Sequence, residues 1–197
     1  MISFDHPHIQ LFYNYLNGFA PVSQNSFEDF LPLIKIRNVQ KNESIVFRGQ
    51  TARNIYFVCE GILISQWMDD EANVYVKNFF VEGHLAGSTV SMLTDTPSGF
   101  GIESVTNGTI LEMNYQRYKE VIYKHDDLKN YYIANLEQNW IIENERRQIS
   151  FAAENATERY ISFLNKYPKL PQRVPQWLIA SYLGITPTQL SRIRKGL

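Results

Sequence analysis

Hydroxyl and cationic side chains gather near the C-terminus at spacings that would place them on one face of a helix. The residues that follow this i, i+3, i+4, i+7 spacing are Thr188, Ser191, Arg192 and Lys195. Arginine can form two hydrogen bonds to guanine, whereas lysine and hydroxyl groups can bind phosphate. Leu190, Ile193 and Leu197 form the apolar stripe that we expect to be buried on the opposite side. The spacing therefore predicts an amphipathic helix whose polar face could enter the major groove of DNA.

The residues around this helix carry the signals of a helix-turn-helix. Thr186 can cap the helix, Pro187 suits its first position, and Gln189 completes a capping box with Thr186. Gly184 suits the left-handed conformation that ends a preceding helix. Residues 174–197 are therefore predicted to form two short helices joined by a tight turn. The residues predicted to contact DNA are Thr186, Pro187, Thr188, Gln189, Ser191, Arg192, Arg194 and Lys195.

Charge is distributed unevenly along the chain. Residues 157–197 contain seven Lys or Arg and one acid, Glu158, whereas the whole chain has a net charge of −1. A basic C-terminal segment on an acidic body indicates that this segment binds a polyanion. The alternative is a surface helical hairpin whose basic face is simply solvated.

Length and composition indicate a globular protein. The chain has 197 residues, of which 44% are hydrophobic, enough for one large domain or two modest ones. No apolar run reaches the roughly 18 residues needed to span a bilayer, and no signal peptide is evident, so we expect a cytoplasmic protein without a membrane partner. The single cysteine, Cys59, excludes an internal disulfide, a Cys₄ zinc site or an iron–sulfur cluster within one chain, and we expect it in a buried strand.

The preceding segments predict helices, then a small barrel. Two short amphipathic stretches within residues 8–36 are predicted to be helices ahead of a sheet. Short β-rich runs separated by turn residues follow over 37–114, as in a barrel or jelly roll. Asn107-Gly108 among them is a strong hairpin signal. Residues 115–124 are predicted to form a short helix.

A segment without Gly or Pro, residues 126–153, is predicted to be one long helix. Apolar and polar residues that repeat every seven positions along it are Leu128, Asn135, Ile142 and Ile149. Such a repeat is typical of a helix that associates with a second copy of itself. The alternative is a helix lying on its own barrel, which Trp140 and Phe151 would serve equally well.

This order of elements resembles the Crp/Fnr family of dimeric transcription factors, in a short form without a C-terminal wing. The matching segments are FRGQTARNIYFVCEGIL (47–63), FFVEGHLAGSTVSML (79–93) and IASYLGITPTQLSRIRKGL (179–197). The resemblance implies an α+β fold: N-terminal helices, a cyclic-nucleotide-binding-like β-barrel or jelly roll, a long dimerisation helix and a C-terminal helix-turn-helix. The implied domains are a sensor domain at 1–124, the dimerisation helix at 125–153 and a DNA-binding domain at 154–197.

The resemblance also implies an effector pocket. Its residues would be Gly83, His84, Leu85, Ala86, Gly87, Ser88, Pro97 and Ser98. Members that bind cyclic nucleotides use a Gly-Glu pair and a later Arg; we match the pair to Gly83-His84, and residues 95–101 contain no Arg. A buried phosphate without a guanidinium partner is poorly compensated. We therefore predict no response to cyclic AMP and no cofactor or metal, and we interpret His84 and His125 as a turn residue and a helix-end residue.

The resulting prediction is a homodimeric transcription regulator that binds double-stranded DNA and is not an enzyme. RNA polymerase and an unknown small-molecule effector are its other expected partners. A cupin-like metalloenzyme would need a His-x-His pair on barrel strands, whereas His6-Pro7-His8 precedes the predicted barrel. A sensor module that has lost DNA binding would have a neutral or acidic terminal helix. Thr188 replaces the Glu that is common in the family, so the DNA sequence preference should differ.

Overall fold

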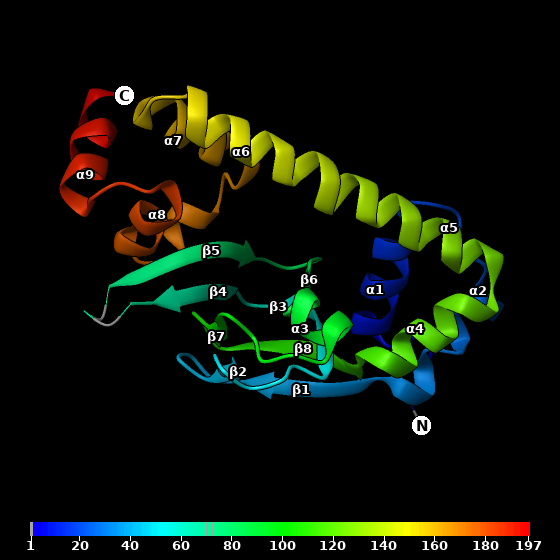
Figure 1. Cartoon of the computed structure of the whole chain (residues 1–197). Coiled ribbons are helices and arrows are strands. Elements are labelled where there is room, and N and C mark those ends of the chain that lie inside the picture. The colour runs from blue at the N-terminus through cyan, green and yellow to red at the C-terminus, as the bar shows by residue number, and fades with distance from the viewer. Residues whose placement is uncertain (1, 70, 72) are drawn as a thin grey trace.

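The fold is α+β and is built on two antiparallel sheets (Figure 1). The computed structural model describes residues 2–69, 71 and 73–197. The strands within these ranges are β1 (Lys35–Val39), β2 (Ser44–Val46), β3 (Asn54–Glu60), β4 (Leu63–Met68), β5 (Val74–Phe80), β6 (Leu85–Ala86), β7 (Gly101–Ser104) and β8 (Gly108–Asn114). They form sheets of order β1-β8-β3-β6 and β2-β7-β4-β5, as predicted for a jelly-roll barrel.

Helices precede, interrupt and follow the barrel. They are α1 (Pro7–Asn17), α2 (Gln24–Glu28), α3 (Thr89–Thr94), α4 (Tyr115–Lys124), α5 (Asp126–Asn135), α6 (Glu143–Ala153), α7 (Ala156–Lys166), α8 (Gln176–Leu183) and α9 (Pro187–Gly196). Within the described ranges, no helix is both long and apolar enough to cross a membrane.

The N-terminal helices differ from the prediction in their second member. Helix α1 buries Ile9, Phe12 and Leu16 against the barrel core. The second predicted stretch contains only the five-residue α2, followed by a 3₁₀ turn at Leu31–Leu33 and then strand β1. Pro32 explains the difference, because it has no N–H with which to continue an α-helix. The chain therefore enters the barrel earlier than the predicted start at residue 37.

Apolar side chains fill the space between the two sheets. Val58 on β3 and Ile110 on β8 meet Leu63 on β4 and Ile102 on β7. Alternate residues of β4 and β5 point the other way, so that Ile64, Val76 and Phe79 join a second core on the outer face of the sheet. This second core is where the C-terminal helices pack. The predicted burial of Cys59 in a strand is confirmed.

The prediction of a hairpin at Asn107-Gly108 is wrong. Strands β7 and β8 belong to different sheets, so this connection crosses from one sheet to the other. Asn107 accepts a hydrogen bond from the Lys41 amide at 2.8 Å, and Gly108 pairs with Val39 on β1. A Cβ at Gly108 would overlap the carbonyl oxygen of Glu60. Glycine is required here because the two backbones approach closely. The Asn-Gly pair, which is typical of a two-residue turn, is explained by this approach instead.

The long helix is present and runs unbroken from Asp126 to Ala153, with a π-helical stretch at Leu136–Ile142 between α5 and α6. Its N-terminal half packs on its own domain: Leu128 is fully buried, and Asn135 donates to the Tyr15 hydroxyl at 2.7 Å. Leu128 and Asn135 of the seven-residue repeat are therefore buried within one chain, which contradicts their predicted role in self-association. The other two, Ile142 and Ile149, are exposed.

The C-terminal helices fold back onto the barrel, where α8 lies against β5 (Figure 1). Strand β5 ends its sheet, so its outward N–H and C=O groups have no neighbouring strand. The Ser181 hydroxyl of α8 fills this gap: it donates to the Val74 carbonyl at 2.6 Å and accepts from the Val76 amide at 2.9 Å. Arg173 also forms a bidentate ion pair with Glu82. This docking was not predicted from local sequence patterns.

The crossing at Gly108 makes a stability prediction. Gly108→Ala should lower the free energy of unfolding by about 1–3 kcal/mol, because the added methyl group meets backbone that cannot rotate away. Gly99→Ala is the matched control, since a Cβ there meets nothing within 4 Å and should change stability by less than about 0.5 kcal/mol. Urea unfolding measures both. Equal stabilities for the two variants would contradict the observed crossing.

Candidate DNA-binding helix and effector cleft

The turn between α8 and α9 has the conformation that the sequence predicts. Gly184 is left-handed with φ of +67°, and it ends α8. Thr186 Oγ1 accepts from the Gln189 amide at 3.1 Å, and Gln189 Oε1 accepts from the Thr186 amide at 3.2 Å. These reciprocal bonds are the capping box, with Pro187 at the start of α9. The orientation of α9 is therefore fixed at its first turn.

The apolar stripe of α9 is shorter than predicted. Leu190 is fully buried and Ile193 is half-buried, both in the core that joins the C-terminal helices to the barrel. Leu197 is exposed, because α9 ends at Gly196 and Leu197 lies beyond its last turn. Two anchors therefore hold the helix.

The opposite face of α9 is solvent-exposed. All the residues predicted to contact DNA are exposed, namely Thr186, Pro187, Thr188, Gln189, Ser191, Arg192, Arg194 and Lys195. Among the described residues, no carboxylate lies within ion-pair distance of Arg192, Arg194 or Lys195. These cations are therefore placed to bind an external anion.

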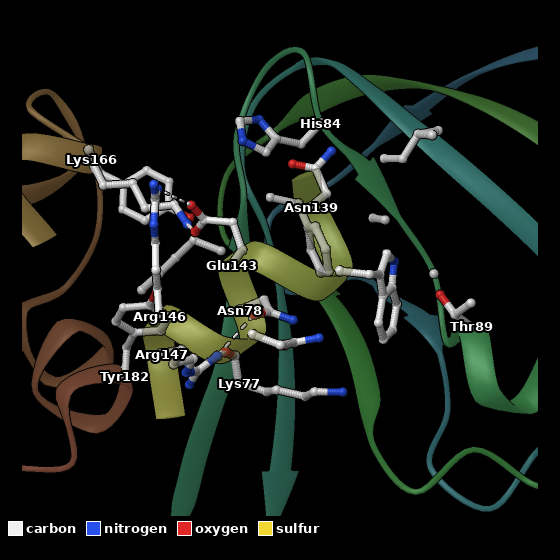
Figure 2. A pocket seen from close by; sticks show the side chains of 18 of the residues that line it. Lys77, Asn78, His84, Thr89, Asn139, Glu143, Arg146, Arg147, Lys166 and Tyr182 are labelled. Atoms are coloured by element: carbon white, nitrogen blue, oxygen red, sulfur yellow. Dashed lines mark hydrogen bonds and ion pairs between the residues drawn. The ribbon is translucent and has the colours of Figure 1, made fainter. Parts of the chain in front are cut away.

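A second candidate site is an open cleft of about 820 Å³ between the barrel and the long helix. Its walls are β5, the β6–α3 turn, the second half of the long helix, and α7. Figure 2 shows Asn139, Glu143, Arg146 and Arg147 on the long helix, with Arg147 reaching Asn78 of β5, while the Lys77 side chain extends away from Arg147. Lys166 comes from α7 and Tyr182 from α8, so one cleft joins the barrel to the C-terminal helices.

Half of the predicted effector residues line this cleft. His84, Leu85, Ala86 and Gly87 do so. Gly83, Ser88, Pro97 and Ser98 do not appear in its wall. Instead, the buried hydroxyls of Ser88 and Ser98 are hydrogen-bonded to each other at 2.8 Å. The predicted set is therefore divided between the cleft wall and a hydrogen-bonded loop.

The loop that carries these serines packs against the barrel interior. Ser91 accepts from the Ala52 amide at 2.9 Å and donates to the Thr96 carbonyl. A Cβ at Gly87 would lie 2.7 Å from the end of the Met92 side chain, which fills the space beside it. Neither Gly83-His84 nor Gly87-Ser88 supplies a carboxylate. The serines are thus satisfied within the loop, and its charged side chain, Asp95, lies 4.0 Å from Arg53.

Electrostatics distinguish the two walls of the cleft. Burial lowers the pKa of His84, whose backbone carbonyl accepts from the Val58 amide at 3.0 Å. Lys77 is exposed as a whole, but its ammonium lies 4.4 Å from the centre of the Phe100 ring. Partial desolvation there and the charge of Arg147 lower the pKa of Lys77. A neutral imidazole thus lies in a cleft whose charged groups are mostly cations.

The charged residues of this cleft were not predicted from the sequence. Arg147 donates to the Lys77 carbonyl and, at 3.0 Å, to Asn78 Oδ1. Glu143 accepts from both Arg146 and Lys166. A lysine within a largely apolar strand, and two adjacent arginines on the long helix, are the sequence signals that could have indicated them. Their meeting depends on how the C-terminal helices fold back.

The remaining candidates for chemistry have structural partners. His6 caps α1 by accepting a hydrogen bond from the His8 amide at 3.2 Å. His125, which lies between α4 and α5, is hydrogen-bonded to Asp29 at 2.9 Å. Burial raises the pKa of the Cys59 thiol to about 12. In the part of the chain that the structure describes, no three His, Cys, Asp or Glu residues are grouped to hold a metal ion.

Comparison with known proteins gives matches in structure alone. No protein-family model matches the chain, and no curated protein is significantly similar to it in sequence. FixK2 from Bradyrhizobium japonicum superposes with a TM-score of 0.72 at 14% identity, over 84% of both chains. CLP from Xanthomonas campestris, titled a c-di-GMP-responsive global regulator, has a TM-score of 0.68 at 18% identity, over 88% of this chain and 91% of CLP.

DNR from Pseudomonas aeruginosa, a transcriptional regulator, matches all of this chain and 89% of its own length, with a TM-score of 0.59 and 20% identity. The chain has the fold of the Crp/Fnr regulators. Within this Crp/Fnr fold, the exposed helix α9 is the second helix of the C-terminal helix-turn-helix, and the cleft lies between the barrel and the long helix.

The composition of the loop predicts how cyclic nucleotides behave. Cyclic AMP and cyclic GMP should bind with a dissociation constant well above about 10 μM, roughly −7 kcal/mol, because no arginine in residues 95–101 can pair with the phosphate. Isothermal titration calorimetry measures the affinity. A dissociation constant at or below that value for either nucleotide would show that the loop binds phosphate by other means.

Proposed function

We propose that this protein is a Crp/Fnr-type transcription regulator that binds double-stranded DNA through α9. The observation that carries the proposal is the face of α9, where Arg192, Arg194 and Lys195 are exposed on a helix fixed by its capping box. A helix of this kind, following a tight turn, fits the major groove. The regulators that share the fold support the assignment.

The protein acts as a homodimer through the second half of the long helix. The large apolar side chains exposed along that helix are Ile133, Trp140, Ile141, Ile142, Ile149 and Phe151. Trp140, Ile149 and Phe151 also line the cleft, whereas Ile133, Ile141 and Ile142 do not. Exposed large apolar side chains grouped along one helix mark an interface. In this proposal residues 1–124 form the sensor domain, 125–153 the dimerisation helix and 154–197 the DNA-binding domain, in a cytoplasmic protein.

The cleft is proposed to bind an effector other than cyclic AMP. Its position between the barrel and α8 would let a ligand influence the DNA-binding helices. RNA polymerase is the further partner expected of a regulator of this type. The protein is proposed not to be an enzyme, in keeping with the regulators that share its fold.

A sensor module of the same fold that has lost DNA binding is the second candidate. The arrangement that would favour it is the docking of α8 on β5, which anchors the C-terminal helices to the barrel. The exposed cations of α9 argue against this second candidate. Three exposed cations in the last two turns of a helix are not expected where DNA binding has been lost.

Selection of bound duplexes from a random DNA pool, together with the mass in solution, tests the proposed function. A dimer should recover a two-fold symmetric motif, with half-sites one helical turn apart, about 34 Å between centres. A monomer at micromolar concentration that selects an asymmetric motif would contradict the dimer. Failure to enrich any motif would favour the second candidate.

The positions of the cations on α9 predict different roles. Arg192 shares the exposed face of α9 with Thr188 and Ser191, so it should read a base. Arg192→Ala should cost about 1–3 kcal/mol on the best site and relax the preference at one position of each half-site. Lys195, near the end of α9, should contact phosphate together with Arg194.

Lys195→Ala should therefore weaken binding to all sequences alike and lower the salt slope by roughly one per protomer. Arg117→Ala on α4, another exposed arginine, serves as the control and should leave both quantities unchanged. Competition binding at two salt concentrations distinguishes them. If Arg192→Ala loses the same affinity on specific and random DNA, Arg192 does not read a base.

A further inference from the structure

We infer that Gln189 determines part of the DNA sequence preference by reading guanine, because the capping box of α9 holds its side-chain amide as a hydrogen-bond donor. The inference rests on the proposed function, since it names a base that α9 recognises. Three observations support it: the direction of the capping hydrogen bonds, the exposure of Gln189, and a second capping box in the same chain that uses a different residue.

The capping box fixes which end of the Gln189 carboxamide faces the protein. The Thr186 amide donates to this carboxamide at 3.2 Å, and a backbone N–H can only donate. The atom that accepts is therefore the oxygen, Oε1, and the NH₂ group occupies the other branch of the carboxamide. The Thr186 hydroxyl lies 3.5 Å from the same oxygen. The side chain is thus oriented with its oxygen inward and its NH₂ group outward from the cap.

The NH₂ group is left over by the capping box. Among the described residues, Gln189 Nε2 takes part in no hydrogen bond, and Gln189 is solvent-exposed on the first turn of α9. The backbone offers few other donors at this turn. Pro187 has no N–H, and the N–H of Gln189 bonds the Thr186 hydroxyl at 3.1 Å. Because the side chain is already held in place, binding DNA through it costs little further conformational entropy.

A second capping box, at the start of α7, has an acid in the equivalent place. There Asn155 is the cap, and Glu158 Oε2 accepts from the Asn155 amide at 2.8 Å. A glutamate at this position also interacts favourably with the positive N-terminal end of the helix dipole. Helix α9 has no acid in its first turn. Gln189 therefore lacks that stabilisation, but it keeps the capping bond and adds N–H groups that a glutamate does not have.

A side chain that can only donate distinguishes the bases in the major groove. Guanine presents two adjacent acceptors there, O6 and N7, adenine and thymine present one acceptor each, and cytosine presents only an N4 donor. Glutamine pairs with adenine by accepting from N6 and donating to N7, which requires its oxygen to be free. The oxygen of Gln189 is bonded to Thr186. Its NH₂ group therefore favours guanine and disfavours cytosine.

Gln189 lies one turn before Arg192 on α9. The N-terminal residues of a recognition helix are the ones that approach base edges. Three residues rise about 4.5 Å along a helix, which is close to the roughly 3.4 Å between successive base pairs. Gln189 and Arg192 should therefore contact neighbouring base pairs of the half-site.

Selection from a random duplex pool with the wild type and with Gln189→Glu tests the inference. The glutamate completes the same kind of capping box, as Glu158 does in α7, but it has acceptors only. The wild type should enrich guanine at one position of each half-site. Gln189→Glu should enrich cytosine on the same strand at that position, because a carboxylate accepts from the N4 amine. Competition between the guanine and cytosine duplexes should show a preference of about tenfold that reverses in the variant.

Two further variants separate base reading from charge and from folding. Gln189→Met removes the donor without adding charge, and it should bind duplexes with any base at this position within about threefold of one another. Gln40→Glu adds the same charge as Gln189→Glu at an exposed position between β1 and β2, and it should keep the wild-type preference. Arg192→Ala should relax a different, neighbouring position. Thermal unfolding checks the fold of each variant.

Three results would overturn the inference and leave the proposed function standing. If Gln189→Glu weakens all duplexes alike, Gln189 contacts phosphate. If this variant selects the wild-type motif with unchanged affinity, Gln189 only caps the helix. A wild-type preference for adenine at the position that Gln189→Glu alters would show that the oxygen is free to bind DNA. If the wild type itself enriches no motif, the proposed function fails and this inference fails with it.

Discussion

The outer edge of β5 is the constraint on which the rest of the structure depends. An edge strand presents unpaired N–H and C=O groups that must be covered or solvated. Here two parts of the chain cover them: Ser181 bonds Val74 and Val76, and Arg147 bonds the carbonyl of Lys77. Apolar packing of α8 on the outer face of the sheet adds to these bonds. One strand thus fixes both the C-terminal helices and the second half of the long helix.

This shared edge explains why α8 lies against the cleft. The long helix begins on the N-terminal core, where Leu128 and Asn135 are buried, and ends over β5. The chain then reverses through α7, whose capping box is formed by Asn155 and Glu158, and lays α8 beneath the long helix. The cleft is the space enclosed by this reversal. Its lining comes from the barrel, the long helix, α7 and α8.

Local signals allowed most elements to be predicted from the sequence. The capping box of Thr186 and Gln189, and the left-handed Gly184, depend on neighbouring residues alone, and they predicted the helix-turn-helix correctly. The barrel and the long helix followed from periodicity and from the absence of Gly and Pro. The failures came from long-range contacts. Gly108 is needed for an approach to Glu60, and Leu128 is buried by helices far away in sequence.

The cleft could not be predicted for the same reason. Lys77 and Arg147 are seventy residues apart, and neither belongs to a recognisable motif. Arg147 contacts the strand at Lys77 because β5 has a bulge there, α7 reverses the direction of the chain, and α8 packs on the edge of β5. The resemblance directed attention to residues 83–88 and 97–98, of which His84 to Gly87 line the cleft. The charged residues on the opposite wall of the cleft were not predicted from the resemblance.

Amide hydrogen exchange at Val76 tests this account most directly, because that N–H donates to Ser181 and has no strand partner. The account predicts slow exchange in the wild-type protein and a clear acceleration in Ser181→Ala. The amide of Val58, which donates to the carbonyl of His84 inside the barrel, should not change. A Val76 amide that exchanges as rapidly in the wild type as in the variant would show that α8 does not hold the edge of β5.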